Sequence, residues 1–457
     1  HALPGIRPTL PQFRKLARIL LAKPAGSPAE ATILPPMSEA VDVLHLLRQR
    51  GFVQQVSDEA ALTALLAAGP LTFYAGFDPT APSLHVGSMI PLMAMAQLAR
   101  AGHRPIAVLG GGTAMVGDPS GRSELRQMMT VEAIAENRRM IEPQVRTFLA
   151  AAADSAIIVD NAEWLAPLGY LEFLREIGRH FSVNRMLAAE AYRQRMEKGL
   201  SFIELNYQIL QAYDYLTLYR RHGCLLQIGG DDQWGNILAG TDLIRRLHQT
   251  QAHALTFPLI TTASGAKMGK TAKGAVWLSA QRTSPFDFYQ YFVNVDDRDT
   301  GRLLKLLTFL DLDEIDRLVA REGAELREAK RVLAAEVTAI VHGREAAEAA
   351  AEAARAAFGG GAVGEDGSGP RGEAVPTHAV DFADAPAGLK IVDLLCASGL
   401  VPSKSAARRL VEQGGVRWGQ RKVESIDDTL SPDEIPAGGT LLHAGKKHLR
   451  RIVRQSS

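Results

Sequence analysis

Residues 73–91 of this chain of 457 residues read FYAGFDPTAPSLHVGSMIP, and the expected fold is built around them. The apolar run Phe73–Phe77 predicts a short buried strand, which Pro79 ends because proline donates no ladder hydrogen bond. Ser83 is expected to cap a mostly apolar helix over residues 84–101. A strand followed by a turn and a helix is the repeating unit of a parallel α/β sheet.

The turn between this strand and this helix carries residues that suit a phosphate ligand. His85, Gly87 and Ser88 would lie in the first helical turn, where free N–H groups and the helix dipole favour an anion. Gly87 has no side chain, so a base or a ribose can approach the backbone there. Thr80 and His85 are placed to donate hydrogen bonds to a phosphate as charge develops on it. A capped helix with a surface histidine would give the same pattern.

A second stretch, residues 264–274, reads SGAKMGKTAKG and predicts a glycine-rich loop. Lys267, Lys270 and Thr271 would offer two cations and a hydroxyl to a polyphosphate. A solvated basic loop is the alternative interpretation of this stretch when it is considered alone.

In this order, the two stretches resemble the paired signatures of class I aminoacyl-tRNA synthetases, usually written HIGH and KMSKS. The resemblance is closest to the tyrosyl-tRNA synthetases and extends from about Met37 to the C-terminus. It rests on YAGFDPTAPSLHVG (74–87), GDPSG (117–121), YQILQAYD (207–214), QIGGDDQWGN (227–236) and KMGKT (267–271). One departure is Ser88, which stands where the family has its second signature histidine. A serine donates a hydrogen bond to a ribose but does not stack on it.

The resemblance implies an α/β fold with three folded parts. A doubly wound, parallel, Rossmann-like catalytic domain is expected over residues 37–284, with a dimer-forming connective insertion at about 150–205. A helical anticodon-region domain would occupy residues 285–357. A flexible linker over 358–388, rich in glycine, would lead to a small α+β S4-like RNA-binding domain over 389–457.

The pattern of apolar runs supports this fold class independently of the resemblance. Short runs that predict buried strands recur at 106–109, 157–159, 225–229 and 255–260. Helical patterns are predicted at 131–149, 171–198, 202–221, 285–293, 299–308, 312–321 and 325–357. Strands that alternate with helices predict a parallel α/β sheet.

The helix predicted over residues 202–221 carries Tyr207, Gln211 and Asp214 at i, i+4 and i+7, so these side chains share one face. A solvated helix edge would give the same spacing. The resemblance implies a pocket instead, in which Asp214 and Tyr74 hold a phenolic hydroxyl. Tyr207, Gln211 and Asp118 would then hold the α-ammonium group of the amino acid.

The run that follows the strand predicted at 225–229 is expected to complete the site. The resemblance implies that Gln233 reaches the substrate carboxylate and that Asp232 takes the ribose hydroxyls. Asp231 and Asp232 are adjacent acids that suggest a metal site as an alternative, but no His or third acid is nearby to complete one. The residues implied for ATP are Gly76, Asp78, His85, Gly87, Ser88, Gly230, Asp232, Lys267, Met268 and Lys270. Those implied for catalysis are Thr80, His85, Lys267, Lys270 and Thr271.

The C-terminal end of the chain is basic although the whole chain is balanced at a net charge of +1. Residues 389–457 hold twelve Lys and Arg against seven Asp and Glu. Ser403 is expected to cap a helix that presents Lys404, Arg408 and Arg409 to the phosphates of an RNA. A solvated basic face is the alternative.

Residues 1–36 differ from the rest of the chain. They begin with His, are rich in Pro and Ala, and hold five Lys and Arg against a single acid, Glu30. We interpret them as a poorly ordered extension upstream of a natural start at Met37, with an organellar presequence as the alternative.

Composition bounds the class of protein. With 46% hydrophobic residues the chain has ample core, and no apolar run reaches the ~20 residues of a membrane span. Cys224 and Cys396 lie in unrelated segments, which argues against a disulfide framework or a zinc site and fits the cytoplasm.

The resemblance implies a two-step reaction. Tyrosine would be activated by ATP to tyrosyl-adenylate with release of pyrophosphate, and then transferred to the 3′ end of tRNA(Tyr). We expect Mg²⁺ with the ATP, no other cofactor, a homodimer and no membrane association. The alternatives are a tryptophanyl enzyme, another nucleotidyltransferase of the superfamily, and an RNA-binding protein derived from a synthetase with weak or no activation activity.

Overall fold

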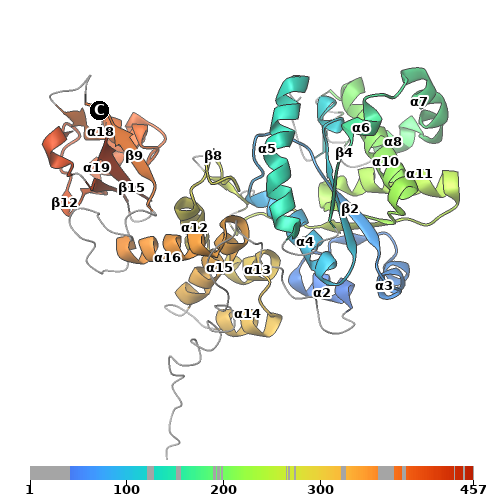
Figure 1. Cartoon of the computed structure of the whole chain (residues 1–457), viewed down its shortest axis with the longest axis horizontal. Helices are drawn as coiled ribbons and strands as arrows, with labels where there is room; N and C mark the ends of the chain where they lie inside the picture. Colours follow the sequence, from blue (N-terminus) through green and yellow to red (C-terminus); the bar gives the residue numbers. More distant parts are fainter. Residues whose placement is uncertain are drawn as a thin grey trace, which may run out of the picture.

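The computed structural model describes most of the chain after residue 41. The described ranges are 42–120, 128–150, 156–188, 192, 196, 199–263, 265, 268–271, 274–320, 326–358, 375–382, 388–436, 438–445 and 448–455, with only the backbone at 270, 271 and 356–358. The expectations for the extension at 1–36 and for the linker core at 359–372 lie outside these ranges, and the domain limits stay predictions. Figure 1 shows the sheet, the helical region and a C-terminal body along the long axis.

A six-stranded sheet forms the first part, as the alternation of strands and helices predicted. In spatial order its strands are β1 (Gln55–Val56), β6 (His253–Phe257), β5 (Leu226–Gly230), β2 (Thr72–Phe77), β3 (Arg104–Leu109) and β4 (Ile157–Asp160). All neighbours are parallel except β1 and β6. The chain winds outward in both directions from the β2–β5 pair, so the predicted doubly wound fold is confirmed and the switch point lies there.

Alternate residues of β2 supply two different cores. Phe73, Ala75 and Phe77 pack with α4 (Met89–Arg100) and α5 (Val131–Ala150). Tyr74 packs on the other face with α10 (Phe202–His222) and α11 (Trp234–His248). Figure 1 shows α5 and α10 on opposite sides of the sheet. Because helices cover both faces, the strands are mostly apolar.

Helix α4 begins later than predicted, at Met89 rather than at residue 84. Val86–Ser88 form a single 3₁₀ turn, and His85 before it is extended, with φ −122° and ψ 171°. The backbone of Leu84 and Val86 is paired with a later segment: Val86 N–H donates to Val276 O at 2.9 Å, and Leu278 N–H donates to Leu84 O at 2.8 Å. Ser83 is therefore not the helix cap, and its hydroxyl donates to Leu84 O instead.

Two further helix predictions were wrong in their extent. The helix predicted over 325–357 is two helices, α15 (Leu326–His342) and α16 (Arg344–Phe358), because Gly343 between them has a left-handed φ of +89°. The segment predicted as helical over 171–198 contains the short helices α7 (Tyr170–Glu176) and α8 (Val183–Ala188), with extended backbone at Phe181 between them.

The helical region begins with α12 (Pro285–Val293), which Ser284 caps, and continues through α13 (Asp297–Leu307) and α14 (Leu312–Val319). Earlier in the chain, α2 (Val43–Arg50) and α3 (Glu59–Ala67) precede β2, and Asp58 caps α3. No helix among the described residues is long and apolar enough to cross a membrane.

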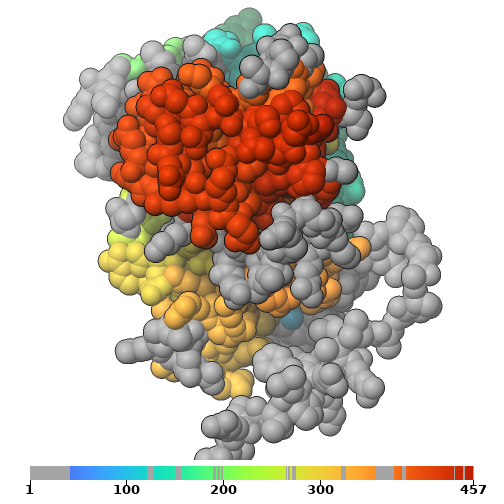
Figure 2. Space-filling model, turned by 90° about the vertical axis from the view of Figure 1, so that its left-hand side faces the viewer, coloured from blue at the N-terminus to red at the C-terminus, as the bar shows by residue number. Residues whose placement is uncertain are grey.

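The C-terminal body combines a sheet with two helices, as the predicted α+β domain requires. Its five-stranded sheet runs in the order β12 (Arg421–Lys422), β11 (Val416–Trp418), β14 (Thr440–Ala444), β15 (His448–Arg454) and β9 (Thr377–Val380). Short strands β10 (Leu389–Lys390) and β13 (Thr429–Leu430) pair beside α18 (Ile391–Ala397) and α19 (Lys404–Glu412). Figure 2 shows this body in front of the helical region.

The C-terminal body is attached to the start of α12. Phe286 of α12 shares a small apolar core with Leu441 and Leu449 of the C-terminal sheet. Arg450 of β15 forms an ion pair of 2.9 Å with Asp287 of α12. Helix α12 thus lies between the six-stranded sheet and the C-terminal body (Figure 1).

Arg50 is buried and binds the carbonyl groups at the end of α13. It donates to Lys305 O and Thr308 O at 3.1 Å and to Leu310 O at 2.7 Å. We expect Arg50→Met to lower the free energy of unfolding by about 2–4 kcal/mol, because three buried carbonyls lose a charged donor. Arg48→Met, which removes an exposed ion pair with Glu59, should cost less than about 1 kcal/mol. Equal losses in urea denaturation would contradict this assignment.

Candidate active site

The functional candidates gather where the parallel strands end, beside the switch point. Asp78 follows β2, Thr113 follows β3, Asn161 follows β4, and Asp232 follows β5. In doubly wound sheets this edge is where ligands bind, because the loops there diverge and leave a crevice. Helix α10 closes the edge with the face that carries Tyr207, Gln211 and Asp214.

Asp214 is a buried carboxylate that two neutral donors hold in place. Trp164 Nε1 donates to its Oδ1 at 2.7 Å, and Asn161 Nδ2 donates to its Oδ2 at 2.9 Å. Only 3% of Asp214 is exposed, and this burial raises its pKa to about 7 although both donors oppose the shift. No cation pairs with Asp214 among the interactions of the described residues, so its carboxylate suits a neutral hydroxyl donor.

The hydroxyl of Tyr74 is buried near Asp214 and has no hydrogen-bond partner among the described residues. Its ring lies edge-on to Tyr215, with the ring centroids 5.2 Å apart. Burial, and after it the charge of Asp214, raises the pKa of the Tyr74 phenol. The amide oxygen of Gln211 is likewise buried without a partner. Buried polar groups are nearly always paired, so these two indicate a polar ligand.

A chain of hydrogen bonds connects Asp214 to a second carboxylate, Asp78. Asn161 Nδ2 donates to Thr113 Oγ1 at 3.0 Å, and Thr113 Oγ1 donates to Asp78 Oδ1 at 2.9 Å. The hydroxyl of Tyr207 donates to Asp78 Oδ2 at 3.0 Å. Gly110 is required at this point, because a Cβ there would lie 2.0 Å from Asp78 Oδ1.

Three carboxylates surround Tyr207. Burial raises the pKa of its phenol most, followed by the charges of Asp78, Asp118 and Asp214. A region with several carboxylates attracts a cationic group such as an α-ammonium. The roles of Tyr207, Gln211 and Asp118 remain predictions, which the acidic surroundings of Tyr207 support.

Gln233 links Asp118 to the loop after β5. Its Nε2 donates to Asp118 Oδ2 at 2.7 Å and to Asp232 Oδ2 at 3.3 Å, while its Oε1 accepts from Asn236 Nδ2 at 3.2 Å. Asp231 is instead occupied by Gln55 Nε2 at 2.7 Å and by the hydroxyl of Thr256 at 2.9 Å.

The two adjacent acids therefore have different partners. Asp231 accepts hydrogen bonds from Gln55 of β1 and Thr256 of β6. Only Asp232 lies with Gln233 and Asp118 on the side of the predicted site. Among the described residues no group of three or more His, Cys, Asp or Glu side chains is placed to hold a metal ion.

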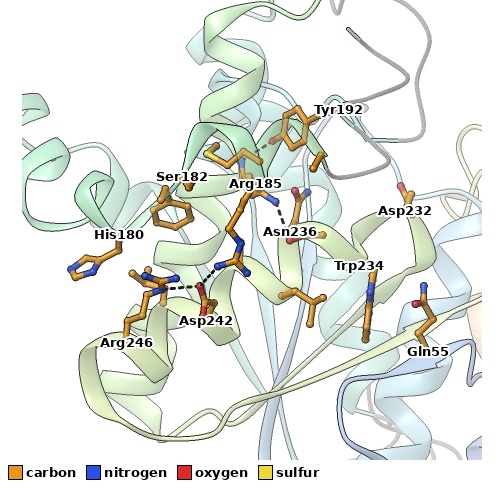
Figure 3. Close-up of a pocket in the computed structure, with 18 of the residues that line it drawn as sticks. Gln55, His180, Ser182, Arg185, Tyr192, Asp232, Trp234, Asn236, Asp242 and Arg246 are labelled. Carbon is orange, nitrogen blue, oxygen red and sulfur yellow. Dashed lines mark hydrogen bonds and ion pairs between the residues drawn. The ribbon is translucent and has the colours of Figure 1, made fainter.

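A cavity of about 890 Å³ opens beside Asp232. Figure 3 shows Asp232, Trp234 and Gln55 at one end of it, and Arg185 and Arg246 at the other end, where both meet Asp242. The ion pairs of Asp242 with Arg185 and Arg246 are 3.6 Å and 2.8 Å long. The cavity therefore combines an aromatic side chain, an acid near the predicted ribose position and a cationic far end.

The segment after the KMGKT loop brings the two signature stretches into direct contact. Val276 and Leu278 pair with Val86 and Leu84, and the ring of Trp277 lies 6.3 Å from that of exposed His85.

Gly269 of the loop lies against the His85 turn. It has a φ of +77°, and a Cβ at Gly269 would lie 3.1 Å from Val86 Cβ. This long-range contact, which sequence reasoning did not foresee, fixes the relative position of the two stretches.

Individual residues of the two signatures are described to different degrees. Thr80 is exposed, a Cβ at Gly76 would meet open space, and a Cβ at Gly87 would lie 2.8 Å from the His85 ring. Lys267 lies outside the described residues. Lys270 and Thr271 are described by their backbone alone, as strand β7 paired with β8 (Gly274–Ala275), whereas Met268 is buried. The roles predicted for these residues, and for Ser88 and Gly230, remain predictions.

Three side chains of the site were missed by sequence reasoning. Asn161, Trp164 and Thr113 make the hydrogen bonds that hold Asp214 and Asp78. Their signal was positional, because each follows a predicted strand at its carboxyl end. Such positions hold ligands or the side chains that orient them.

The basic face of the C-terminal body lies on α19 and the adjacent hairpin. Lys404, Arg408 and Arg409 are exposed, and Lys404 pairs with Asp393 at 2.7 Å. Arg417 and Lys422 on β11 and β12 are exposed as well and were not singled out from the sequence. Ser403 caps α19 as predicted, accepting from Ala406 N–H.

Comparison with known proteins agrees with this arrangement. Residues 66–359 match the family model of class I tRNA synthetases (W and Y), and residues 389–435 match the S4 domain. The tyrosine–tRNA ligase of Clostridium tetani is 50% identical over 412 residues, which cover 90% of this chain and 99% of that protein. The tyrosine–tRNA ligase of Caldanaerobacter subterraneus is 48% identical over 413 residues, with the same two coverages.

Solved structures give the same result. A C-terminally truncated mitochondrial tyrosyl-tRNA synthetase from Coccidioides posadasii superimposes with a TM-score of 0.60 at 31% sequence identity, covering 68% of this chain and 91% of that one. The two family models together include both signature stretches and helices α18 and α19 of the C-terminal body. The chain therefore belongs to the tyrosyl-tRNA synthetases, class I aminoacyl-tRNA synthetases that carry a C-terminal S4 domain.

Proposed function

We propose that the pocket between α10 and the sheet binds tyrosine, and that the chain activates it as a tyrosine–tRNA ligase. The observation that carries this proposal is the buried Asp214, held by Asn161 and Trp164 beside the unpaired hydroxyl of Tyr74. A phenolic hydroxyl that donates to Asp214 and accepts from Tyr74 would pair both groups. Phenylalanine would give neither group this hydrogen bond and would leave the Tyr74 hydroxyl unpaired, at a cost of about 1–3 kcal/mol for each lost hydrogen bond.

The amino-acid end of the substrate is oriented by the second carboxylate cluster. The α-ammonium lies among Tyr207, Gln211 and Asp118, and the unpaired Gln211 oxygen is one of its acceptors. Gln233 donates to Asp118 in the free protein and reaches the substrate carboxylate when tyrosine is bound. That carboxylate then points toward the His85 turn, where ATP presents its α-phosphate.

The first chemical step is the attack of a tyrosine carboxylate oxygen on the α-phosphorus of ATP. The bond to the β-phosphate oxygen breaks, and pyrophosphate leaves with that electron pair. No protein side chain forms a covalent bond. The rate comes from holding both reactants in line and from donors that stabilise the charge on the phosphate oxygens. We assign these donors to Thr80, His85, Lys267, Lys270 and Thr271.

ATP is held between the two signature stretches. Gly76, Gly87 and Gly230 let its base and ribose approach the backbone, Asp232 accepts from the ribose hydroxyls, and Asp78, Ser88 and Met268 complete the contacts. Support comes from the open space over Gly76 and from the side chain of Asp232 beside the large cavity. Mg²⁺ enters with the phosphates of ATP, whose charge it neutralises.

In the second step, a hydroxyl at the 3′ end of tRNA(Tyr) attacks the carbonyl carbon of tyrosyl-adenylate and AMP leaves. The exposed cations Lys404, Arg408 and Arg409 of the S4 domain bind the tRNA phosphates, together with Arg417 and Lys422.

The free cysteines Cys224 and Cys396 fit a protein of the reducing cytoplasm.

We further propose that the chain acts as a homodimer. Among the described residues every exposed large apolar side chain except Leu259 lies between Met128 and Ile203. Several of them are highly exposed, such as Leu171 at 79% and Phe202 at 69%. Leu171 and Phe202 lie in the segment predicted as the dimer-forming insertion, and exposed apolar patches mark association surfaces.

Phe202→Asp should weaken the dimer by at least about tenfold, because a charge replaces an apolar contact. Sedimentation velocity over a dilution series measures this change. Sedimentation of the unaltered protein as a monomer would overturn the dimer proposal.

Amino-acid-dependent ATP–pyrophosphate exchange tests the proposed activity. We expect exchange with tyrosine, and a kcat/KM for phenylalanine at least about 30-fold lower, since two buried groups lose their partner. Tryptophan should support no exchange. A folded protein that exchanges with none of the three would favour the RNA-binding alternative and make Ser88→His the next variant.

Asp214→Asn tests the pocket itself. Burial raises the pKa of Asp214 to about 7, so the ionised carboxylate, which accepts the hydrogen bond from the substrate hydroxyl, becomes populated between pH 6 and pH 8. Tyrosine should therefore bind up to about tenfold more tightly at pH 8 than at pH 6. Asp214→Asn should abolish this dependence and weaken tyrosine more than ATP, as measured by calorimetry. Equal losses for the two ligands would contradict the assignment.

A further inference from the structure

Tyr291 of helix α12 contacts the KMGKT loop through its hydroxyl group. The Tyr291 hydroxyl accepts a hydrogen bond from the Gly269 N–H at 3.0 Å and lies 3.5 Å from Met268 Sδ. Gly269 is the residue directly before Lys270. Its carbonyl accepts from Val276 N–H at 2.8 Å, so the backbone of Gly269 is held at both its N–H and its carbonyl.

The position of Gly269 matters because the loop contacts the His85 turn there. The left-handed φ of Gly269 and its approach to Val86 allow the peptide to lie directly on that turn. A shift of this peptide would move the backbone of Lys270 relative to His85. Interactions that locate Gly269 therefore locate the two signature stretches relative to each other.

On the side that faces α12, the loop is not closely packed, because a cavity separates part of it from the helix. A cavity of about 560 Å³ lies between Met268 and Val276 of the loop segment, Tyr291 of α12, and Arg450 of the C-terminal body. The hydroxyl of Tyr291 reaches the loop at the edge of this space. A second polar anchor lies at the start of the loop, where Asp299 Oδ2 accepts from Ala263 N–H at 2.8 Å.

We propose that Tyr291 is a positioning residue of the adenylation step, which holds the Gly269–Lys270 peptide against the His85 turn. The expected effect on the rate of adenylate formation rests on the proposed function. The expected effect on the position of the Gly269 peptide does not. Tyr291 acts through the loop and does not touch the reacting atoms. Its loss should slow adenylate formation and leave the tyrosine pocket, which lies on α10, unchanged.

The test is Tyr291→Phe, which removes the hydroxyl and keeps the ring. We expect the rate of adenylate formation at saturating ATP and tyrosine to fall about three- to tenfold, as the loss of one hydrogen bond allows. The KM for tyrosine and the unfolding midpoint should not change. Tyr289→Phe is the matched control, because this tyrosine of the same helix lies near Arg331 and Arg355 instead of the loop.

A double-mutant cycle separates positioning from a general structural effect. If Tyr291 acts through Lys270, Tyr291→Phe should have little further effect on the rate in a Lys270→Ala background. Additive losses in the cycle, an unchanged rate for Tyr291→Phe, or a raised KM for tyrosine would each overturn the proposal.

Hydrogen exchange at Gly269 keeps the inference testable whatever the activity. The Gly269 amide should exchange at least about threefold faster in Tyr291→Phe than in the unaltered protein and in Tyr289→Phe, because it loses its acceptor. Equal exchange in all three proteins would overturn the proposal. Faster exchange in a protein that shows no pyrophosphate exchange would contradict the proposed function and leave the structural role of Tyr291 supported.

Discussion

The structure depends on the pairing of residues 84–86 with residues 276–278. These hydrogen bonds join the first turn after β2 to the segment after the KMGKT loop, although the two lie far apart in the chain. The pairing keeps His85 extended, delays the start of α4 and places Gly269 on Val86. A pair of glycine-rich stretches that bind phosphate separately would be weak sites. The backbone pairing fixes the two stretches side by side, as the proposed reaction, which depends on positioning, requires.

The second constraint is the burial of the Asp214 charge. The neutral donors Trp164 and Asn161 hold its carboxylate, and Thr113 and Tyr207 donate to the neighbouring carboxylate of Asp78. Desolvation makes such carboxylates strong acceptors that are costly to leave unpaired, and it raises the pKa of Asp214. The buried Tyr74 hydroxyl and Gln211 amide oxygen have no hydrogen-bond partner among the described residues, which supports the proposal of a substrate with matching polar groups.

Local patterns in the sequence predicted the parts of this structure that local chemistry determines. The strand Phe73–Phe77, the alternation of strands and helices and the shared face of Tyr207, Gln211 and Asp214 all follow from short-range periodicity. The start of α4 did not, because pairing with Val276 and Leu278 overrides the capping preference of Ser83. The break at Gly343 was missed because a single glycine is tolerated within many helical patterns.

Sequence reasoning named charged candidates for the site and missed the neutral side chains that hydrogen-bond to Asp214 and Asp78. Asn161, Trp164 and Thr113 are distant from Asp214 in the sequence, and only the packing of the segments after β3 and β4 against α10 brings them together. Tyr291 was missed for the same reason, since its contact with Gly269 joins the helical region to the loop. Such contacts join segments that are far apart in the sequence, so the periodicity of apolar residues does not predict them.

The central claim is that one pocket and two joined signature stretches make a single adenylate, that of tyrosine. The most direct measurement is to incubate the protein with ATP, pyrophosphatase and an equal mixture of the twenty amino acids, isolate the protein, and identify the bound adenylate by mass spectrometry. The account predicts tyrosyl-adenylate alone, retained in the absence of tRNA. A different aminoacyl-adenylate, or none from a folded protein, would contradict it.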